Sequence, residues 1–273
     1  MEGFILAAGL GTRLRPLTDR RPKALVEIPF ATPDGATKPE TLLEHTIHRL
    51  ERCGVSHIVV NVHHFADMVI DFIASRRWQA RIDISDERDL LLDTGGGLKK
   101  AASLFSGNDN ILIHNVDILS DIDLADVERR HRTLSNLATL CVSHRSTKRL
   151  LAFSPDGLLL SRTSPDNANQ NSPLNTSHLT LNTSNFPLST FHSPLSTLHS
   201  PLPTPLAFSG VSVVSPALFD LLPPPDHPYP IIDEYIRLSA AGHRIAAYIH
   251  PADRWLDVGK PETLNQAAQW KLS

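Results

Sequence analysis

Short apolar runs rich in β-branched residues alternate with amphipathic segments over the first 145 residues, and this alternation limits the fold more than any other feature of the chain. The runs at 58–62 and 110–114 are typical of strands buried in a parallel sheet. The segments 41–53 and 65–74 place their apolar residues on one helical stripe. This order predicts a three-layer, Rossmann-like α/β fold, a single domain in which helices cover both faces of a mixed, mostly parallel sheet.

The second half of the chain continues this pattern. We expect further strands at 137–142, 207–214 and 244–249, and further helices at 124–134, 216–222, 231–241 and 261–270. With residues 164–206 set aside, about 230 residues remain, which is a common size for one compact domain.

Residues 164–206 differ in composition from the rest of the chain. From Ser172 they divide into five seven-residue units with leucine in each third place, and no charged residue occurs between Asn167 and Phe219. The recurring prolines argue against a coiled coil, because each costs about 3 kcal/mol inside a helix. We therefore predict a weakly ordered, dispensable surface insertion in a domain formed by 1–163 and 207–273, with a binding element as the alternative.

Charge and cysteine content exclude several classes of protein. The net charge is −3, the pI is near 6.5 and aromatic residues make up 6% of the chain, so neither nucleic acid nor an anionic membrane is an expected partner. Cys53 and Cys141 lie far apart, which indicates reduced thiols. The first strand begins without a signal peptide, and no apolar run approaches ~20 residues. We expect a soluble cytoplasmic protein, either a monomer or a small homo-oligomer.

The stretch LAAGLGTRLRPLTDRRPK, from Leu6 to Lys23, follows the first apolar run. Gly9 and Gly11 let backbone N–H groups approach an anion closely, and Arg13 adds a cation beside them. The spacing differs from both the P-loop and the dinucleotide-binding fingerprint. A simple chain turn is one interpretation, and a polyphosphate cradle is the other.

A second cluster of glycines, Gly95 to Gly97, follows Asp93 and Thr94 and precedes a helix expected to start near Leu98. A flexible loop with a helix N-cap, worth about 1 kcal/mol to the helix, is one interpretation. Three consecutive glycines cost more chain entropy than a cap requires. We therefore favour a backbone segment that lies against a ligand.

The first glycine segment closely resembles the signature of the sugar-phosphate nucleotidyltransferases, which runs Leu-Ala-Ala-Gly-x-Gly-Thr-Arg-Leu-x-Pro-Leu-Thr, four residues, then Lys. The resemblance implies a mononucleotide-binding α/β fold whose glycine loop wraps a nucleoside triphosphate. It implies that Arg13 and Lys23 face the phosphates and act in catalysis. The nucleotide-binding residues expected on this basis are Leu6, Ala7, Ala8, Gly9, Gly11, Thr12, Arg13, Lys23, Glu87 at a base edge, and Gly95.

Two aspartates match positions that, in this family, jointly hold Mg²⁺. Asp117 follows the strand at 110–114, and Asp257 lies in Trp-Leu-Asp-Val-Gly near the C-terminus. Either could instead be a turn or cap residue. Nucleotidyl transfer benefits from a divalent cation that neutralises phosphate charge, and carboxylate oxygens suit Mg²⁺. Val116 stands where many relatives have glycine.

The sugar side of the site is expected to involve residues from both halves of the chain. On the family's pattern, these are Thr94, Gly96, Asn115 and Gly210, and we add Lys148 as a residue that could substitute for a missing family position. Many relatives have a Glu-Lys pair for the sugar phosphate after the strand at 137–142, which this chain lacks. Arg145, Lys148 and Arg149 are the candidate substitutes.

The reaction that the resemblance implies joins a nucleoside triphosphate to a sugar 1-phosphate, with release of pyrophosphate. The short form and the motifs are similar to those of the N-acetylmuramate-1-phosphate uridylyltransferases of cell-wall recycling. One alternative is a mannose, glucose or heptose 1-phosphate nucleotidyltransferase that uses GTP, dTTP or CTP. Another is a catalytically inactive regulatory homologue, although the joint presence of Arg13, Lys23, Asp117 and Asp257 favours a catalyst.

Overall fold

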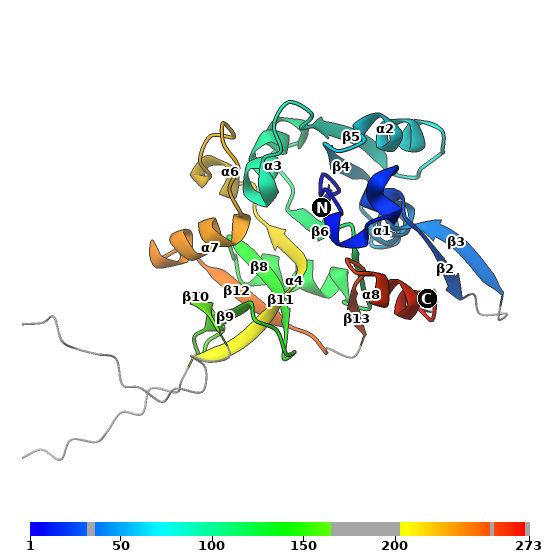
Figure 1. Ribbon diagram of the computed structural model, residues 1–273. Coiled ribbons are helices and arrows are strands. Elements are labelled where there is room, and N and C mark those ends of the chain that lie inside the picture. Colours follow the sequence, from blue (N-terminus) through cyan, green and yellow to red (C-terminus); the bar gives the residue numbers. More distant parts are fainter. Residues whose placement is uncertain (32–35, 165–202, 252–253, 271–273) are drawn as a thin grey trace, which may run out of the picture.

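The computed structural model describes residues 1–31, 36–164, 203–251 and 254–270, which form a nine-stranded mixed sheet with helices on both faces (Figure 1). One half of the sheet is parallel, in the order β6, β1, β4, β5. These strands are β1 (Glu2–Leu6), β4 (His57–Val62), β5 (Arg81–Asp86) and β6 (Ile111–Asn115). Because they are parallel, their carboxyl ends meet at one edge, and the segments that leave them gather there.

The other half of the sheet is built around a long antiparallel strand. Its strands are β8 (Ala138–Ser143), β9 (Leu150–Phe153), β10 (Leu159–Thr163), β11 (Thr204–Val214) and β12 (Ile245–Ile249). β11 pairs antiparallel with β6, β8 and β9, and β12 pairs parallel with β8. From Phe208 to Ser212, β11 advances four residues while β8 advances two, from Val142 to Leu140. This bulge bends β11 at the edge where the parallel strands end.

Seven helices in the described part of the chain cover the two faces. They are α1 (Leu42–Arg52), α2 (Ala66–Ala74), α3 (Asp93–Ala101), α4 (Leu124–Thr133), α6 (Leu218–Leu221), α7 (Ile231–Ala240) and α8 (Pro261–Ala267). Buried side chains of α1, α2, α4 and α8 join one apolar core, and those of α3, α6 and α7 join the other. The sheet therefore lies between two helical layers, which confirms the expected three-layer α/β fold.

Local sequence explains where α1 begins and which side it buries. The Thr41 hydroxyl accepts a hydrogen bond from the Glu44 N–H at 3.1 Å, a cap worth about 1 kcal/mol. Leu43, Ile47 and Leu50 recur at helical spacing and are fully buried. Truncation of such a leucine to alanine typically costs about 2–5 kcal/mol.

Short elements complete the molecule. Two two-stranded antiparallel pairs form outside the main sheet, β2 (Glu27–Ala31) with β3 (Thr37–Thr41) and β7 (Ile118–Ser120) with β13 (Trp255–Asp257). Four single turns of 3-10 helix are η1 (Thr12–Leu14), η2 (Leu17–Asp19), η3 (Lys23–Leu25) and η4 (Ala102–Leu104). The β7–β13 pair joins the segment after β6 to the C-terminal region.

Every strand and helix expected from the sequence is present, with small differences at most ends; α3 begins at Asp93 rather than near Leu98. The sequence-based interpretation missed β5, the β9–β10 hairpin and the β2–β3 and β7–β13 pairs, which are short or lack a strong apolar alternation. β1 ends at Leu6, so Ala7 and Ala8 lie beyond the strand. Cys53 ends α1 and Cys141 is buried in β8, and both thiols are free, as expected.

The segment 165–202 lies outside the described residues, so most of the expected insertion at 164–206 is not placed. Its expected C-terminal boundary is wrong, because Thr204 to Leu206 belong to β11 and pair with β9. Leu206 is buried in this strand. A buried strand lacks charged residues just as the repeats do, so the absence of charge did not mark where the insertion ends and β11 begins.

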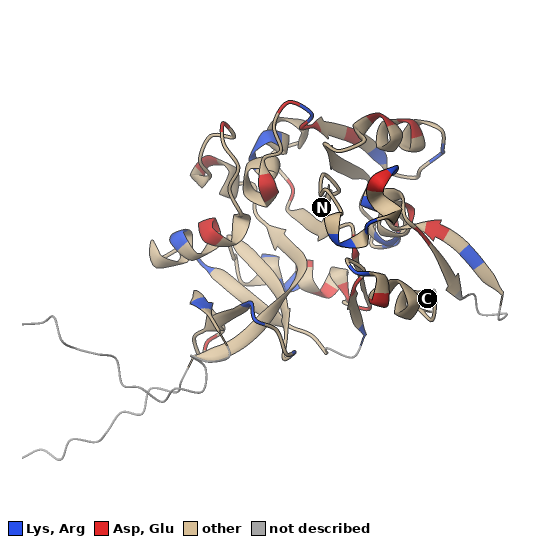
Figure 2. Ribbon diagram, in the orientation of Figure 1, with Lys and Arg blue, Asp and Glu red and all other residues tan. Residues whose placement is uncertain are grey.

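Charge is spread over the surface without segregation by sign. Figure 2 shows Lys and Arg interspersed with Asp and Glu on several helices and on β3. Any strong local electrostatic field must therefore come from a small group of charges rather than from a whole face.

Among the described residues, no helix combines the length and the apolar character needed to cross a membrane.

Candidate active site

The turn after β1 is held from behind by Asn61, a residue that the sequence-based interpretation missed. Asn61 lies opposite Leu6 at the end of β4, and its Oδ1 accepts hydrogen bonds from the Ala7 N–H (2.7 Å) and the Ala8 N–H (3.2 Å). Both alanine N–H groups are therefore engaged within the protein. The signal that could have revealed Asn61 is a polar residue inside the apolar run 58–62.

The glycine loop presents unpaired backbone donors where the turn leaves the sheet. Gly11 has φ +64°, and a Cβ there would lie 3.0 Å from the Thr18 side chain, whose hydroxyl donates to the Gly11 carbonyl at 2.8 Å. No described residue accepts a hydrogen bond from the N–H of Gly9 or Gly11. These donors and the small side chains suit the close approach of a phosphate.

Lys23 and Asp117 form the central ion pair of the site. The Lys23 Nζ lies 2.6 Å from the Asp117 Oδ2, and 15% and 10% of their side chains are exposed. Burial opposes ionisation of Asp117, but the Lys23 charge and the hydrogen bonds to the carboxylate together outweigh it and lower the pKa of Asp117 below its ordinary value. Asp117 therefore carries a negative charge at neutral pH.

Asp257 reaches the same place through the β7–β13 pair, where it lies opposite Ile118. Its Oδ2 lies 3.7 Å from an Arg13 guanidinium nitrogen, which contributes little beyond long-range attraction. Burial, followed by the charge of Asp117, raises the pKa of Asp257. Gly259 keeps this corner open, since a Cβ there would lie 2.5 Å from Arg13 and 2.6 Å from Asp257.

The two carboxylates fit the binding of a divalent cation. The Asp257 Oδ1 is buried and has no hydrogen-bond partner among the described residues, and the charge of Asp117 disfavours ionisation of Asp257. A divalent cation would supply the missing partner and relieve the repulsion. The described chain has no cluster of three acidic, His or Cys residues arranged as ligands. Mg²⁺ is usually bound by one or two carboxylates, with substrate phosphate and water as the remaining ligands. The two aspartates fit this pattern.

A cavity of about 440 Å³ opens at the carboxyl ends of β1, β4 and β6 and at the start of α3. It is lined by Leu6, Ala8, Gly9, Lys23, Asn61, Leu91, Asp93, Thr94, Asn115, Asp117 and Pro228. Such a crevice at strand ends is the usual ligand site of an open α/β sheet. Seven of the residues expected at the site contribute to this lining: four from the nucleotide group, two from the sugar group and Asp117 from the metal pair.

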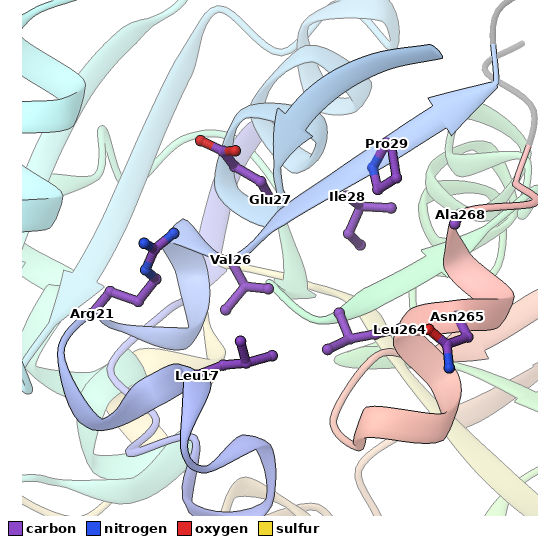
Figure 3. A pocket seen from close by; sticks show the side chains of 9 residues that line it. All are labelled: Leu17, Arg21, Val26, Glu27, Ile28, Pro29, Leu264, Asn265 and Ala268. Carbon is purple, nitrogen blue, oxygen red and sulfur yellow. The ribbon is translucent and has the colours of Figure 1, made fainter.

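A smaller cavity, of about 260 Å³, lies between η2, β2 and α8. Figure 3 shows the side chains of Leu17 and Val26 facing that of Leu264 across it. Arg21 and Glu27 are its only charged lining residues. We assign the chemistry to the larger cavity, because that is where the ion pair and the glycine loop converge.

The second glycine cluster differs from its expected structure. α3 begins at Asp93, so the glycines form the first turn of the helix rather than a loop before Leu98. A Cβ on Gly95 would lie 2.5 Å from the Tyr229 ring, and the Tyr229 carbonyl accepts a hydrogen bond from the Gly95 N–H at 2.9 Å. Gly96 also packs against Tyr229. Glycine is therefore required here by the close approach of a protein side chain. Gly95 and Gly96 are buried and do not line the cavity.

Glu87 also lies elsewhere than expected, in the interior instead of at a base edge. Its side chain is fully buried, and it accepts hydrogen bonds from the Asn61 amide (2.7 Å) and the Leu92 N–H (3.0 Å). Burial raises the pKa of Glu87. A Cβ on Gly97 would lie 2.6 Å from its Oε1, which explains the third glycine. Glu87 thus supports Asn61 and the chain that leads into α3.

On the expected sugar side, Gly210 and Asn115 lie in contact. Gly210 has φ +75°, and a Cβ there would lie 3.0 Å from the Asn115 amide and 2.8 Å from Ile118. Lys148 is exposed and does not line the cavity, whereas Arg145 is half-buried beside Trp255. The structure therefore brings Gly210 and Asn115 together but leaves Lys148 apart from them.

Comparison with known proteins agrees with this geometry. The model of the nucleotidyl transferase family matches residues 2–150. The chain belongs to this family. N-acetylmuramate alpha-1-phosphate uridylyltransferase of Caulobacter vibrioides is 30% identical, over 99% of this chain and 96% of that protein. This full-length match makes the chain a sugar-phosphate nucleotidyltransferase.

Two further matches define how far the similarity extends. Mannose-1-phosphate guanyltransferase of Gibberella zeae is 34% identical over 52% of this chain. The aligned part covers only 37% of that relative. HddC of Yersinia pseudotuberculosis, solved in complex with GMP-PN, has a TM-score of 0.66 at 20% identity, with 98% of this chain and 97% of that chain covered. The latter match supports the fold alone.

Proposed function

We propose that the protein joins UTP and N-acetylmuramate 1-phosphate to form UDP-N-acetylmuramate and pyrophosphate, with Mg²⁺ as the cofactor. The observation that carries the transfer chemistry is the convergence of Lys23, Asp117 and Asp257 on the glycine loop. The choice of sugar and base is supported by the full-length similarity to the Caulobacter vibrioides uridylyltransferase. The two free thiols suit a reducing compartment such as the cytoplasm.

In the proposed reaction, a phosphate oxygen of the sugar 1-phosphate attacks the α-phosphorus of the triphosphate in line. The bond from the α-phosphorus to the bridging oxygen breaks, and pyrophosphate leaves with that electron pair. The sugar phosphate already supplies an anionic oxygen, so no protein nucleophile is required. Catalysis then rests on positioning and on charge neutralisation.

The residues of the chain divide this work between them. The N–H groups of Gly9 and Gly11 and the cations of Arg13 and Lys23 would bind and orient the triphosphate. Asp117 and Asp257 would hold Mg²⁺, which supplies neutralisation of the phosphate charge when bound. The Lys23–Asp117 pair places a cation and a metal ligand 2.6 Å apart, so the two can act on the same phosphate.

A panel assay tests this function. Pyrophosphate release is measured with each of UTP, GTP, dTTP and CTP against the 1-phosphates of N-acetylmuramate, N-acetylglucosamine, glucose and mannose. We expect UTP with N-acetylmuramate 1-phosphate to be fastest, and Asp257→Asn to lower that rate at least tenfold. Fastest turnover of GTP with mannose 1-phosphate would favour the activity named for the Gibberella zeae relative instead. Absence of turnover across the panel would point to an inactive regulatory homologue.

A further inference from the structure

One polar cluster around Arg145 and Ser209 contacts the segments that carry two groups of the proposed site, Gly210 and Asp257. Gly210 follows Ser209 in the bulge of β11, and Asp257 follows Trp255 by two residues in β13. The Trp255 indole N–H donates to the Ser209 carbonyl at 2.8 Å. The segments that carry the sugar-side glycine and the second aspartate are thus joined directly.

Arg145 ties these segments together from β8. Its guanidinium carbon lies 3.7 Å from the centre of the Trp255 ring, a stacked cation–π arrangement. One terminal nitrogen donates to the hydroxyls of Ser143 (3.0 Å) and Ser209 (2.9 Å), and the other donates to the Phe208 carbonyl. Both terminal nitrogens of the guanidinium are therefore bonded to protein oxygens. Two of these oxygens belong to the neighbouring residues Phe208 and Ser209.

Ser209 is the point where the cluster converges. It is fully buried, and its hydroxyl lies 2.7 Å from the His250 Nε2 as well as within reach of Arg145. A bulge with a glycine at positive φ leaves the ladder locally incomplete, so side chains must hold its shape. Here Arg145 donates to the Phe208 carbonyl and Trp255 to the Ser209 carbonyl, and His250 contacts the Ser209 hydroxyl.

The pattern of bonds distinguishes between two roles for Arg145. A ligand of the sugar phosphate would keep its fork of N–H groups turned toward the cavity, as arginines at phosphate sites do. Arg145 instead directs it at serine and backbone oxygens and does not line the cavity. Burial lowers its pKa to about 10, opposed by the charge of Asp257, which is consistent with a cation enclosed by protein near the metal ligands.

We propose that Arg145 is a positioning residue that sets Gly210 and Asp257 in one relative arrangement, through Ser209 on one side and Trp255 on the other. This inference rests on the proposed function, because it concerns the sugar and metal groups of that site. Arg145 acts through its planar fork and its stacking face. A lysine keeps the charge but has neither feature.

The experiment compares Arg145→Lys, Arg145→Gln and Trp255→Phe with the double variant Arg145→Lys/Trp255→Phe. We expect both Arg145 variants to lose at least tenfold in kcat/KM for the sugar 1-phosphate and to need several-fold more Mg²⁺ for half-maximal rate. The double variant should be no worse than the more damaged single one, since both changes disrupt one stack. Arg130→Lys is the matched control, because Arg130 lies 5.2 Å over the Tyr248 ring away from the site.

Tryptophan emission gives a readout that does not depend on turnover. Arg145→Lys should shift the emission spectrum in the wild-type background and leave it unchanged in the Trp255→Phe background. Near-wild-type kinetics for Arg145→Lys together with loss in Arg145→Gln would show that charge alone matters and would overturn the proposal. Ser209→Ala, which removes one hydroxyl, provides a milder test if the Arg145 variants do not fold, and it should raise the Mg²⁺ requirement in the same direction. An inactive wild type would refute the proposed function, whereas an unchanged emission spectrum would refute the positioning role.

Discussion

Replacement of Lys23 with methionine tests the ion pair at the centre of the proposed site. The change keeps the length and the apolar stem of the side chain but removes the ammonium group 2.6 Å from Asp117. It therefore deletes one cation expected at the phosphates, leaves Asp117 without its ion-pair partner and leaves Arg13 as the cation beside Asp257. Both turnover and the response to a divalent cation should change.

The magnitude for turnover follows from the lost contact with phosphate. A hydrogen bond to a charged group is worth about 1.5–3 kcal/mol, and about 1.4 kcal/mol corresponds to tenfold in rate. Lys23→Met should therefore lower kcat by roughly 10- to 150-fold. Breaking a fully buried pair costs about 3–5 kcal/mol of stability. Lys23 lines an open cavity, so water can hydrate the remaining carboxylate, and we expect about 1–3 kcal/mol.

The effect on metal binding has a sign that simple damage to the fold would not produce. Without Lys23, the two aspartates repel each other with less compensation, and the pKa of Asp117 should rise from its lowered value. Mg²⁺ should then raise the melting temperature of Lys23→Met by more than it raises that of the wild type. Addition of a chelator should remove that difference.

The assay is pyrophosphate release at saturating substrates, with thermal unfolding measured at several Mg²⁺ concentrations. Lys38→Met serves as the control, because Lys38 also pairs with a carboxylate, Glu40, at 2.9 Å but has a side chain that is 57% exposed and lies outside the cavity. It should keep near-wild-type turnover. A Lys23→Met enzyme with turnover within twofold of the wild type would refute the assigned role of Lys23.

Three further predictions follow from other parts of the molecule. Gly97→Ala should cost about 1–3 kcal/mol of stability and raise the KM for the nucleotide, because the new Cβ would lie 2.6 Å from Glu87. Gly9→Ala, whose Cβ meets only Lys23 at 4.0 Å, should leave stability nearly unchanged, and denaturant unfolding of both variants would check the contrast. His45, His48 and Lys38 hold the pKa of buried Glu40 far below 4.5, so its stabilising effect is present above the unfolded-state pKa and is lost as pH falls. Glu40→Gln should therefore flatten the acid side of a plot of urea midpoint against pH, and an unchanged acid slope would contradict this. Replacement of residues 167–202 by eight Gly/Ser residues, which reach about 15 Å and can cross β9 from β10 to β11, should keep kcat/KM within twofold. A large loss of activity in a folded protein would instead make the segment a binding element.

Much of the fold could be predicted because its signals are local. An apolar run at 58–62 or a helical stripe at 41–53 depends on neighbours in the sequence, and the hydrophobic effect acts on each in the same way in any α/β protein. The glycine loop follows the end of β1, Asp117 follows the end of β6, and Asp257 is the last residue of β13, so all three lie at strand ends. The missed pairs, β2–β3 and β7–β13, depend on partners distant in sequence or on short segments with little periodicity.

The errors at the second glycine cluster and at Glu87 have a common physical cause. Glycine is required wherever two groups approach closely, and the sequence does not show whether the second group is a ligand or a side chain. Tyr229 lies more than 130 residues from Gly95, yet its ring occupies the space that a Cβ would need. A carboxylate such as Glu87 is likewise equally suited to a base edge and to a buried amide until its neighbours are known.

The α/β class could be read from the amino-acid sequence alone, which also predicts a phosphate-binding loop at Leu6 to Lys23 and two carboxylates suited to a divalent cation. These depend on residue type and on spacing along the chain. Three other features are visible only in the folded chain: Lys23 pairs with Asp117, Asn61 accepts hydrogen bonds from the Ala7 and Ala8 N–H groups, and Arg145 bonds within the protein instead of lining the cavity. Each of these depends on which polar groups meet after burial, where every donor and acceptor must find a partner.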